Sequence, residues 1–121
     1  MIIGIGCDIV SIARIKKLII RFQETFLRKI YTREELQAAP NPLSPLYFSY
    51  YSKRFAAKEA YAKATKNGIG KNITFQSIAI LNDKNGAPYF CTHPLQNSNV
   101  RADLSLSDEP PYALSYVILS K

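Results

Sequence analysis

The sequence contains very little of the chemistry on which many metal and redox sites depend. It has one histidine, His93, and two cysteines, Cys7 and Cys91, among 121 residues. The cysteines lie far apart and form no CxxC pair, and a single histidine cannot complete a zinc cluster. A zinc cluster and a CxxC redox motif are therefore excluded. Cys7 lies in an apolar run and is most simply a buried small residue.

Long hydrophobic runs are also missing. No apolar stretch approaches the ~20 residues that a membrane-spanning helix needs, and the first ten residues lack the basic start and cleavage site of a signal peptide. We therefore expect a cytoplasmic protein without membrane insertion. The length predicts one domain, residues 1–121, and the hydrophobic content of 47% suits a packed core. Because so short a chain leaves much apolar surface exposed, oligomerisation is favoured.

Acidic residues are scarce, with nine Asp and Glu against 16 Lys and Arg and a formal net charge of +7. This balance favours an acidic partner: a nucleic acid, an anionic membrane, a polyphosphate ligand or an acidic protein. Composition alone does not choose among them. Arg14, Lys17 and Arg21 lie on one side of a predicted amphipathic helix that follows Ser11. This basic face is either a solvated surface or a docking surface for an acidic partner.

The predicted elements follow the order strand, helices, strands. This order indicates an α+β fold with a long central helix and a mainly antiparallel sheet. Residues 2–10 form an apolar run typical of a buried strand. A capping box that begins at Thr32 predicts a short helix, and Asn85-Gly86 is a strong hairpin signal. The remaining strands are expected at 73–81, 88–92, 102–107 and 113–119.

The long central helix has recognisable signals at both ends. Three prolines within residues 39–45 predict a loop before it. Ser44 and Pro45 have the residue types of an N-cap and a first helical position, so the helix is expected over about 46–65. Asn67-Gly68 predicts a left-handed end.

Three charged residues are candidates for chemistry. Asp8 lies inside the apolar first strand, where a carboxylate is costly unless it meets a cation or hydrogen-bond donors. It either caps the following helix or binds magnesium, which prefers carboxylate oxygens. Glu59 and Lys63 are four residues apart and share a helical face, as an ordinary ion pair or as part of a site. The alanines around this pair allow a ligand or another backbone to come close.

The C-terminal segment LSLSDE carries a further pattern. Ser105 and Ser107 alternate with leucines, so they share one face of a predicted strand. A half-exposed strand that runs into a turn is the simplest interpretation. His93 has no partners in the sequence that would build a Ser/His/Asp triad.

Together these segments resemble the holo-acyl-carrier-protein synthases, a family of 4′-phosphopantetheinyl transferases. The combination of GIGxDI near the N-terminus with FAAKEAxxKA on the long helix is specific, although each string alone would be weak. Order and spacing match over essentially the whole chain, except for residues 37–51. The matching strings are GIGCDIVSIARI, RFAAKEAYAKA with KNGIG after it, FQSIAILNDKNGAPY and LSLSDEPPYALSYVIL.

The resemblance implies an enzyme that transfers 4′-phosphopantetheine from coenzyme A to a serine of an apo-acyl carrier protein, releasing 3′,5′-ADP, in fatty acid biosynthesis. It implies that Asp8 and Glu59 ligate Mg²⁺ together with the diphosphate of coenzyme A. It also implies that Lys63 contacts the phosphates at the reacting centre, and that Lys58 lies close to the coenzyme.

The resemblance extends to partners and assembly. Gly68 and Gly70 would let the backbone approach coenzyme A. Arg14 and Arg21 would dock onto the acidic recognition helix of acyl carrier protein. A homotrimer with each active site between two subunits is also implied.

Asp108 departs from the family pattern, which usually has histidine after the Ser-x-Ser element. An anion there would repel coenzyme phosphates unless a metal or a lysine intervenes, or it would serve as an extra metal ligand or a base. This difference leaves open the alternative that the chain is a catalytically inactive relative that only binds acyl carrier protein. A small nucleic-acid-binding module is the other alternative, but the strands carry no glycine-aromatic RNA-binding string.

Overall fold

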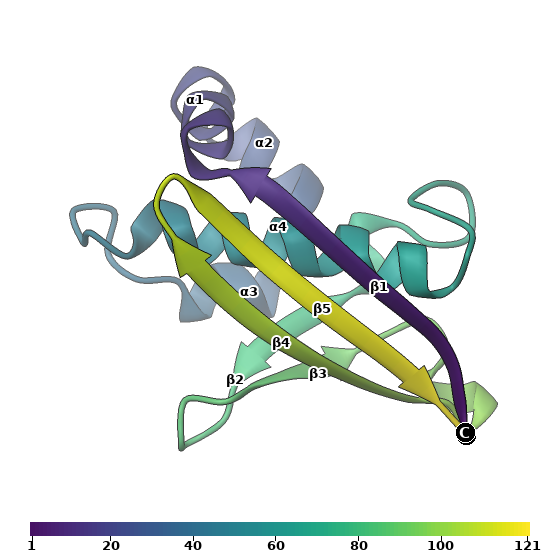
Figure 1. Ribbon diagram of the computed structural model, residues 1–121. Helices are drawn as coiled ribbons and strands as arrows, with labels where there is room; N and C mark the ends of the chain where they lie inside the picture. The colour runs from purple at the N-terminus through teal and green to yellow at the C-terminus, as the bar shows by residue number, and fades with distance from the viewer.

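The computed structural model describes residues 1–121 and consists of two antiparallel sheets and four α-helices (Figure 1). This arrangement confirms the predicted α+β class. A three-stranded sheet has the order β1-β5-β4, and a separate two-stranded sheet pairs β2 with β3. The elements are β1 (Ile2–Ser11), α1 (Ile12–Phe22), α2 (Glu24–Ile30), α3 (Arg33–Ala38), α4 (Tyr47–Ala64), β2 (Ala79–Asn82), β3 (Pro88–Thr92), β4 (Arg101–Glu109) and β5 (Tyr112–Ser120).

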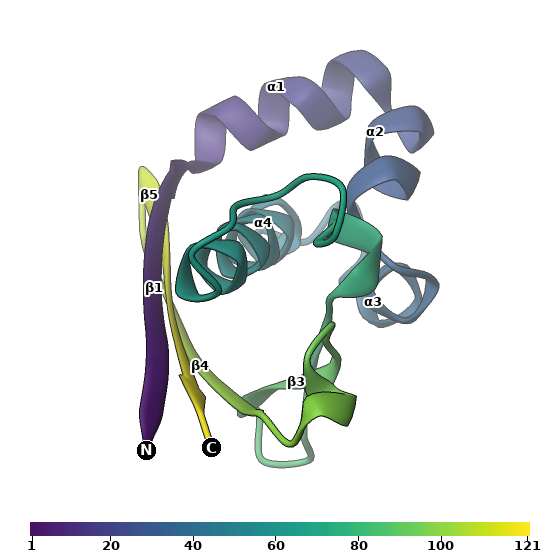
Figure 2. The same cartoon turned by 90° about the vertical axis from the view of Figure 1, so that its right-hand side faces the viewer.

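Helix α4 lies between the three-stranded sheet on one side and the shorter helices on the other (Figure 2). Its alanines pack against the inner face of the sheet, where Val117 and Leu119 of β5 are buried. Its aromatic N-terminal half packs with α1 and α2, where Ile15 and Ile19 are buried. The helix is therefore enclosed by core along most of its length, which leaves only part of its surface for chemistry.

The backbones of β1 and α4 touch at two glycines. A Cβ atom on Gly6 would lie 1.9 Å from the carbonyl oxygen of Ala60, and one on Gly4 would lie 2.0 Å from that of Ala64. No real Cβ fits at such distances, so only glycine is tolerated here. This contact brings Asp8, two residues beyond Gly6, to the side of α4.

The local signals at several element ends are confirmed. The hydroxyl of Ser11 caps α1 by accepting from Arg14 N at 3.3 Å. Thr32 and Glu35 form the capping box of α3. Gly86 has a φ of 84° in the β2–β3 hairpin, and β4 alternates in exposure along its length.

Three details differ from the sequence-based expectations. Helix α4 begins at Tyr47 with Leu46 as N-cap, because the hydroxyl of Ser44 accepts from Leu46 N and closes a turn before the helix. The strand predicted over 73–81 is wrong in its first part: residues 75–77 form a 3₁₀ turn closed by reciprocal side-chain hydrogen bonds between Thr74 and Ser77. Helix α2 had no clear sequence signal. None of the helices combines the length and apolar character needed to cross a bilayer.

Candidate active site

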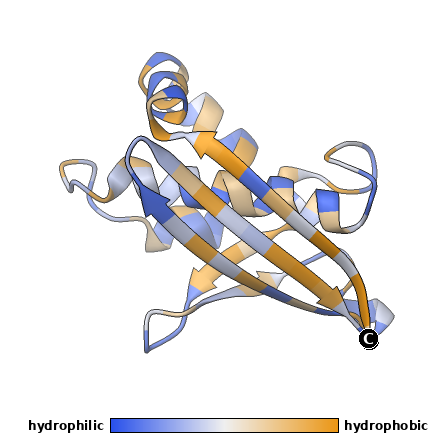
Figure 3. Ribbon diagram, in the orientation of Figure 1, coloured by the Kyte–Doolittle hydropathy of each residue, from blue (hydrophilic) through white to orange (hydrophobic).

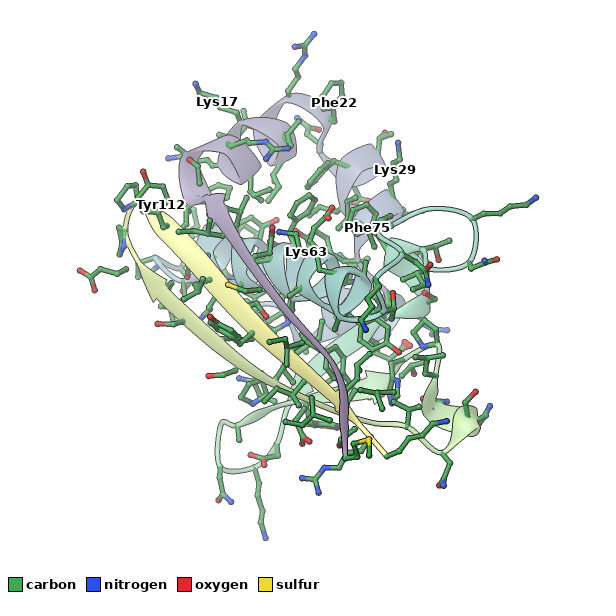
Figure 4. The ribbon with its side chains drawn as sticks, turned by 45° about the vertical axis from the view of Figure 1, so that its right-hand side comes forward. Lys17, Phe22, Lys29, Lys63, Phe75 and Tyr112 are labelled. Atoms are coloured by element: carbon green, nitrogen blue, oxygen red, sulfur yellow. The ribbon has the colours of Figure 1, made fainter.

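Asp8 and Lys63 form the centre of the candidate site. Lys63 Nζ donates to Asp8 Oδ1 at 3.0 Å and to the carbonyl oxygen of Cys7 at 3.0 Å, and it lies on α4 beside β1 (Figure 4). The Asp8 side chain is 17% exposed and that of Lys63 is 54% exposed. The partly buried carboxylate thus meets a cation, as its place in an apolar strand required. Asp8 does not cap α1, because Ser11 does.

Glu59 lies one helical turn before Lys63 and belongs to the same cluster. Burial raises the pKa of the Glu59 carboxyl, and the negative charge of Asp8 raises it further. Lys63 and Arg14 act in the opposite direction. The hydrogen bond to Asp8 raises the pKa of the Lys63 ammonium. The structure therefore gathers two carboxylates and two cations into one patch at the edge of the sheet.

The donor set of this patch fits magnesium. Asp8 and Glu59 are close enough to repel each other, which a divalent cation between them would relieve. No group of three or more His, Cys, Asp or Glu side chains is arranged so that it could hold a metal ion by itself. Mg²⁺ is commonly held by one or two carboxylates and completed by substrate phosphates and water. The two carboxylates therefore suit a magnesium ion that substrate completes.

Lys58 points away from this patch. Its side chain is fully buried, and its Nζ donates to Glu35 Oε1 at 2.6 Å, to Ile30 O at 2.8 Å and to Phe75 O at 3.0 Å. All three ammonium protons are used, so none is left for a phosphate. The geometry therefore disfavours the expected contact of Lys58 with coenzyme A and makes Lys58 a structural residue.

The buried Lys58–Glu35 pair connects three parts of the fold. Glu35 Oε1 also accepts from Thr32 N at 2.9 Å, and Oε2 accepts from Ile80 N at 3.0 Å. Burial lowers the pKa of the Lys58 ammonium, while the charge of Glu35 acts to raise it. The network links α3, α4 and β2 and fixes how α4 is rotated about its axis.

Asp108 lies apart from Asp8 and Glu59. It is on β4, and β5 separates β4 from β1. Its Oδ1 forms an ion pair with Lys53 Nζ at 2.9 Å, and both side chains are partly buried. A lysine therefore neutralises the charge that would otherwise repel phosphates. Within one chain, Asp108 is not placed to share a metal with Asp8.

The remaining predicted residues lie in the loop after α4 and on α1. Gly68 has a φ of 88° in the loop after α4, and a Cβ on Gly68 or on Gly70 would meet no atom within 4 Å. The backbone of this loop is thus open to a ligand. Arg14 and Arg21 are exposed on α1, and Arg14 is near enough to Glu59 to lower its pKa.

Two residues of this region were not identified from the sequence alone. In the sequence, Glu35 and Lys53 look like ordinary charged residues. Their ion-pair partners, Lys58 and Asp108, are distant along the chain. One signal was present for Lys58: neighbouring helical residues point about 100° apart, so Lys58 and Glu59 lie on different sides of the helix. This spacing favours different surroundings for the two side chains.

Comparisons with known proteins identify the family. Residues 4–117 match the 4′-phosphopantetheinyl transferase superfamily. The chain is 41% identical over 122 residues to a holo-[acyl-carrier-protein] synthase of Ehrlichia ruminantium, covering 100% of this chain and 98% of that protein. The crystal structure of the Neisseria meningitidis holo-[acyl-carrier-protein] synthase superimposes with a TM-score of 0.88 at 42% identity, covering all of both chains.

A third relative is the holo-[acyl-carrier-protein] synthase of Helicobacter pylori, solved in complex with coenzyme A. It superimposes with a TM-score of 0.85 at 33% identity, covering 96% of this chain and 99% of the other. The chain therefore belongs to the 4′-phosphopantetheinyl transferase superfamily and, within it, to the holo-[acyl-carrier-protein] synthase family. The resemblance found in the sequence motifs is confirmed.

The buried lysine generates a stability prediction. Lys58→Met should lower the free energy of unfolding by about 3–5 kcal/mol, because it leaves the charge of Glu35 buried without its cation. Lys53→Met is the matched control, since it removes a lysine from the same helix that pairs with a more exposed carboxylate. It should cost about 1 kcal/mol or less. Urea unfolding measures the free energy of unfolding of both variants. Equal losses would show that the buried Lys58–Glu35 pair matters no more for stability than the more exposed Lys53–Asp108 pair.

Proposed function

We propose that this chain transfers 4′-phosphopantetheine from coenzyme A to a serine of an apo-acyl carrier protein and releases 3′,5′-ADP. The reaction serves fatty acid biosynthesis in the cytoplasm, and residues 1–121 act as one domain. Membership of the family supports the reaction class. The observation that carries the proposal is the cluster of Asp8, Glu59 and Lys63 at the junction of β1 and α4.

Asp8 and Glu59 are the proposed ligands of one Mg²⁺ ion. When bound, this ion neutralises charge on the diphosphate of coenzyme A and holds it for in-line displacement. Phosphoryl transfer asks for positioning and charge neutralisation more than covalent help from the protein. Two carboxylates and two nearby cations match that requirement.

Lys63 has a separate proposed role at the phosphates. In the structure its ammonium neutralises Asp8, and half of its side chain is exposed, so it is free to turn. Once Asp8 has its metal, Lys63 can bind the oxygen that bridges the two phosphates. The serine oxygen forms a bond to the β-phosphorus, the bond to the bridging oxygen breaks, and Lys63 is placed to protonate the leaving oxygen.

Two groups are suited to accept the proton of the carrier serine. Glu59 is one, because a carboxylate has two oxygens, and the oxygen that does not ligate a metal can accept a proton. A water molecule held by either carboxylate is the other. Both routes pass through the same carboxylate patch, so both depend on Asp8 and Glu59.

The basic side of α1 is the proposed docking surface for the acidic carrier. Arg14 and Arg21 are exposed on it, and Lys17 lies between them on the outer side of the helix (Figure 4). Arg14 also reaches the surroundings of Glu59. A carrier bound along α1 would therefore present its serine beside the carboxylates, and opposite charges would steer its approach.

The outer face of the three-stranded sheet supports a homotrimer. Apolar residues are frequent along β1 and β5 (Figure 3), several of them are exposed, and no helix covers the outer face of these strands (Figure 2). An exposed apolar patch of this kind indicates a protein interface. The Asp8 side chain is on the inner face, but β1 is an edge strand, so a second copy that packs on the outer face and extends around this edge comes close to Asp8, as an active site between subunits requires. The exposed apolar residues are Ile3, Ile5, Ile9, Tyr112, Tyr116 and Ile118.

The metal site is tested by removing one negative charge at a time. Asp8→Asn and Glu59→Gln should each lower the transfer rate by about a hundredfold or more while the far-UV circular dichroism spectrum stays unchanged. Intact-mass spectrometry of an apo-acyl carrier protein incubated with coenzyme A follows the gain of one phosphopantetheine arm, with Mg²⁺ and with EDTA. Glu24→Gln on exposed α2 is the control. Near-normal rates in the first two variants at saturating Mg²⁺ would refute the assignment.

Carrier docking is tested by charge reversal on α1. Arg21→Glu should raise the KM for the carrier about tenfold and leave the KM for coenzyme A within about twofold. Arg14→Glu should do the same and also disturb the chemical step, because Arg14 influences Glu59. Lys84→Glu, at the distant β2–β3 turn, should change neither constant. If the carrier KM stays constant in both arginine variants, the docking surface lies elsewhere.

The assembly is tested through the outer sheet face. Ile5 is 64% exposed, and Ile5→Glu should convert a trimer into monomers with loss of transfer activity, because it places a charge in an apolar interface. Tyr89→Glu, at an exposed aromatic on β3, should leave the mass unchanged. Light scattering at micromolar protein concentration measures the mass. A monomeric wild-type protein, or a trimeric Ile5→Glu variant, would contradict the proposal.

A further inference from the structure

One hydroxyl in the core has no hydrogen-bond partner. Ser115 on β5 is fully buried, and its Oγ is the single buried side-chain oxygen or nitrogen of the chain that makes no hydrogen bond. Leaving a buried hydroxyl unpaired is costly, and native proteins rarely do so without a reason. Burial alone is not that reason, because the equally buried Ser52 donates to Phe48 O at 2.7 Å.

Ser115 lies directly beside the candidate metal site. In the register of the sheet, Ser115 is the Cα partner of Asp8 on β1. It alternates with buried Ala113 and Val117, so its side chain is on the inner face, toward α4. Side chains directly opposite each other on one face have Cβ atoms about 4.5–5.5 Å apart. A serine hydroxyl can therefore reach an aspartate carboxylate across this pair.

Asp8 has an oxygen available for such a bond. Its only side-chain hydrogen bond is from Lys63 Nζ to Oδ1, and no protein group donates to Oδ2. Alanines occupy the buried positions around Ser115: Ala113 on β5, and Ala56, Ala57 and Ala60 on the facing helix. Alanine would fill the place of Ser115 equally well if only packing mattered.

We propose that Ser115 positions Asp8 for metal binding. When Lys63 leaves Asp8 and the carboxylate turns to take up a divalent cation, Ser115 Oγ–H donates to the carboxylate oxygen that does not face the ion. Carboxylates that ligate metals are held by such hydrogen bonds, and a bond to a charged acceptor is stronger than one between neutral groups. The inference rests on the proposed magnesium site.

Metal affinity tests this role without catalysis. The dissociation constant of Mn²⁺, a paramagnetic probe for the magnesium site, is measured by electron paramagnetic resonance with coenzyme A present and carrier absent. Ser115→Ala should weaken Mn²⁺ binding about tenfold, and Ser115→Cys, of similar size but a poor donor, should do the same. Ser115→Thr, which keeps the hydroxyl, should bind nearly as tightly as the wild type. Ser52→Ala is the control for loss of a buried serine and should bind normally.

Two further readouts separate positioning from a structural role. Ser115→Ala should melt at the same or a higher temperature than the wild type, because it removes an unpaired polar atom. In activity assays of Ser115→Ala, the Mg²⁺ concentration that gives half of the maximal rate should rise, while the KM for the carrier stays unchanged. If Ser115→Ala binds Mn²⁺ normally while Asp8→Asn binds weakly, the metal site stands and the role of Ser115 is refuted. If Asp8→Asn also binds normally, the proposed metal site itself fails.

Discussion

The contact between the backbones of β1 and α4 is the constraint on which the site depends. Gly4 and Gly6 let the strand approach so closely that any side chain there would overlap the carbonyl oxygens of Ala64 and Ala60. A strand held at an ordinary side-chain distance would leave Asp8 too far from Lys63 for a hydrogen bond. The glycines of β1 and the alanines of α4 are therefore part of the geometry of the candidate site, although none of them touches substrate in the proposed reaction.

A second constraint fixes how α4 is rotated. Lys58 is held by three acceptors that come from Glu35, the end of α2 and the 3₁₀ turn before β2. Because Glu59 follows directly in the helix, this buried anchor also determines the direction in which the Glu59 carboxylate points. A buried ion pair is weak support for stability in general, but it specifies geometry when its partners belong to different elements. The buried Lys58 thus helps to orient Glu59 of the candidate site, because the two residues are neighbours in the same helix.

Local features could be predicted from the sequence where a few neighbouring residues determine them. Ser11, the Thr32 capping box and the Asn85-Gly86 turn each carry their own hydrogen-bonding or backbone preference, and helical spacing placed Glu59 and Lys63 together. The pairs Lys58–Glu35 and Lys53–Asp108 depend on the folding of distant segments, so no local pattern reveals them. The roles of the site residues came from the family resemblance, because spacing alone is equally compatible with a solvated ion pair.

The charges of the patch explain how one cluster serves both the free and the loaded protein. Two carboxylates lie near each other in a protein of formal net charge +7. Without metal, Lys63 neutralises Asp8, and Arg14 lies near Glu59, which limits the repulsion between the carboxylates. In the proposed reaction, substrate brings phosphates together with a divalent cation, so the carboxylates exchange one cation for another and Lys63 becomes available to the phosphates. On this proposal, Lys63 holds in the free protein the place beside Asp8 that the divalent cation takes when substrate binds.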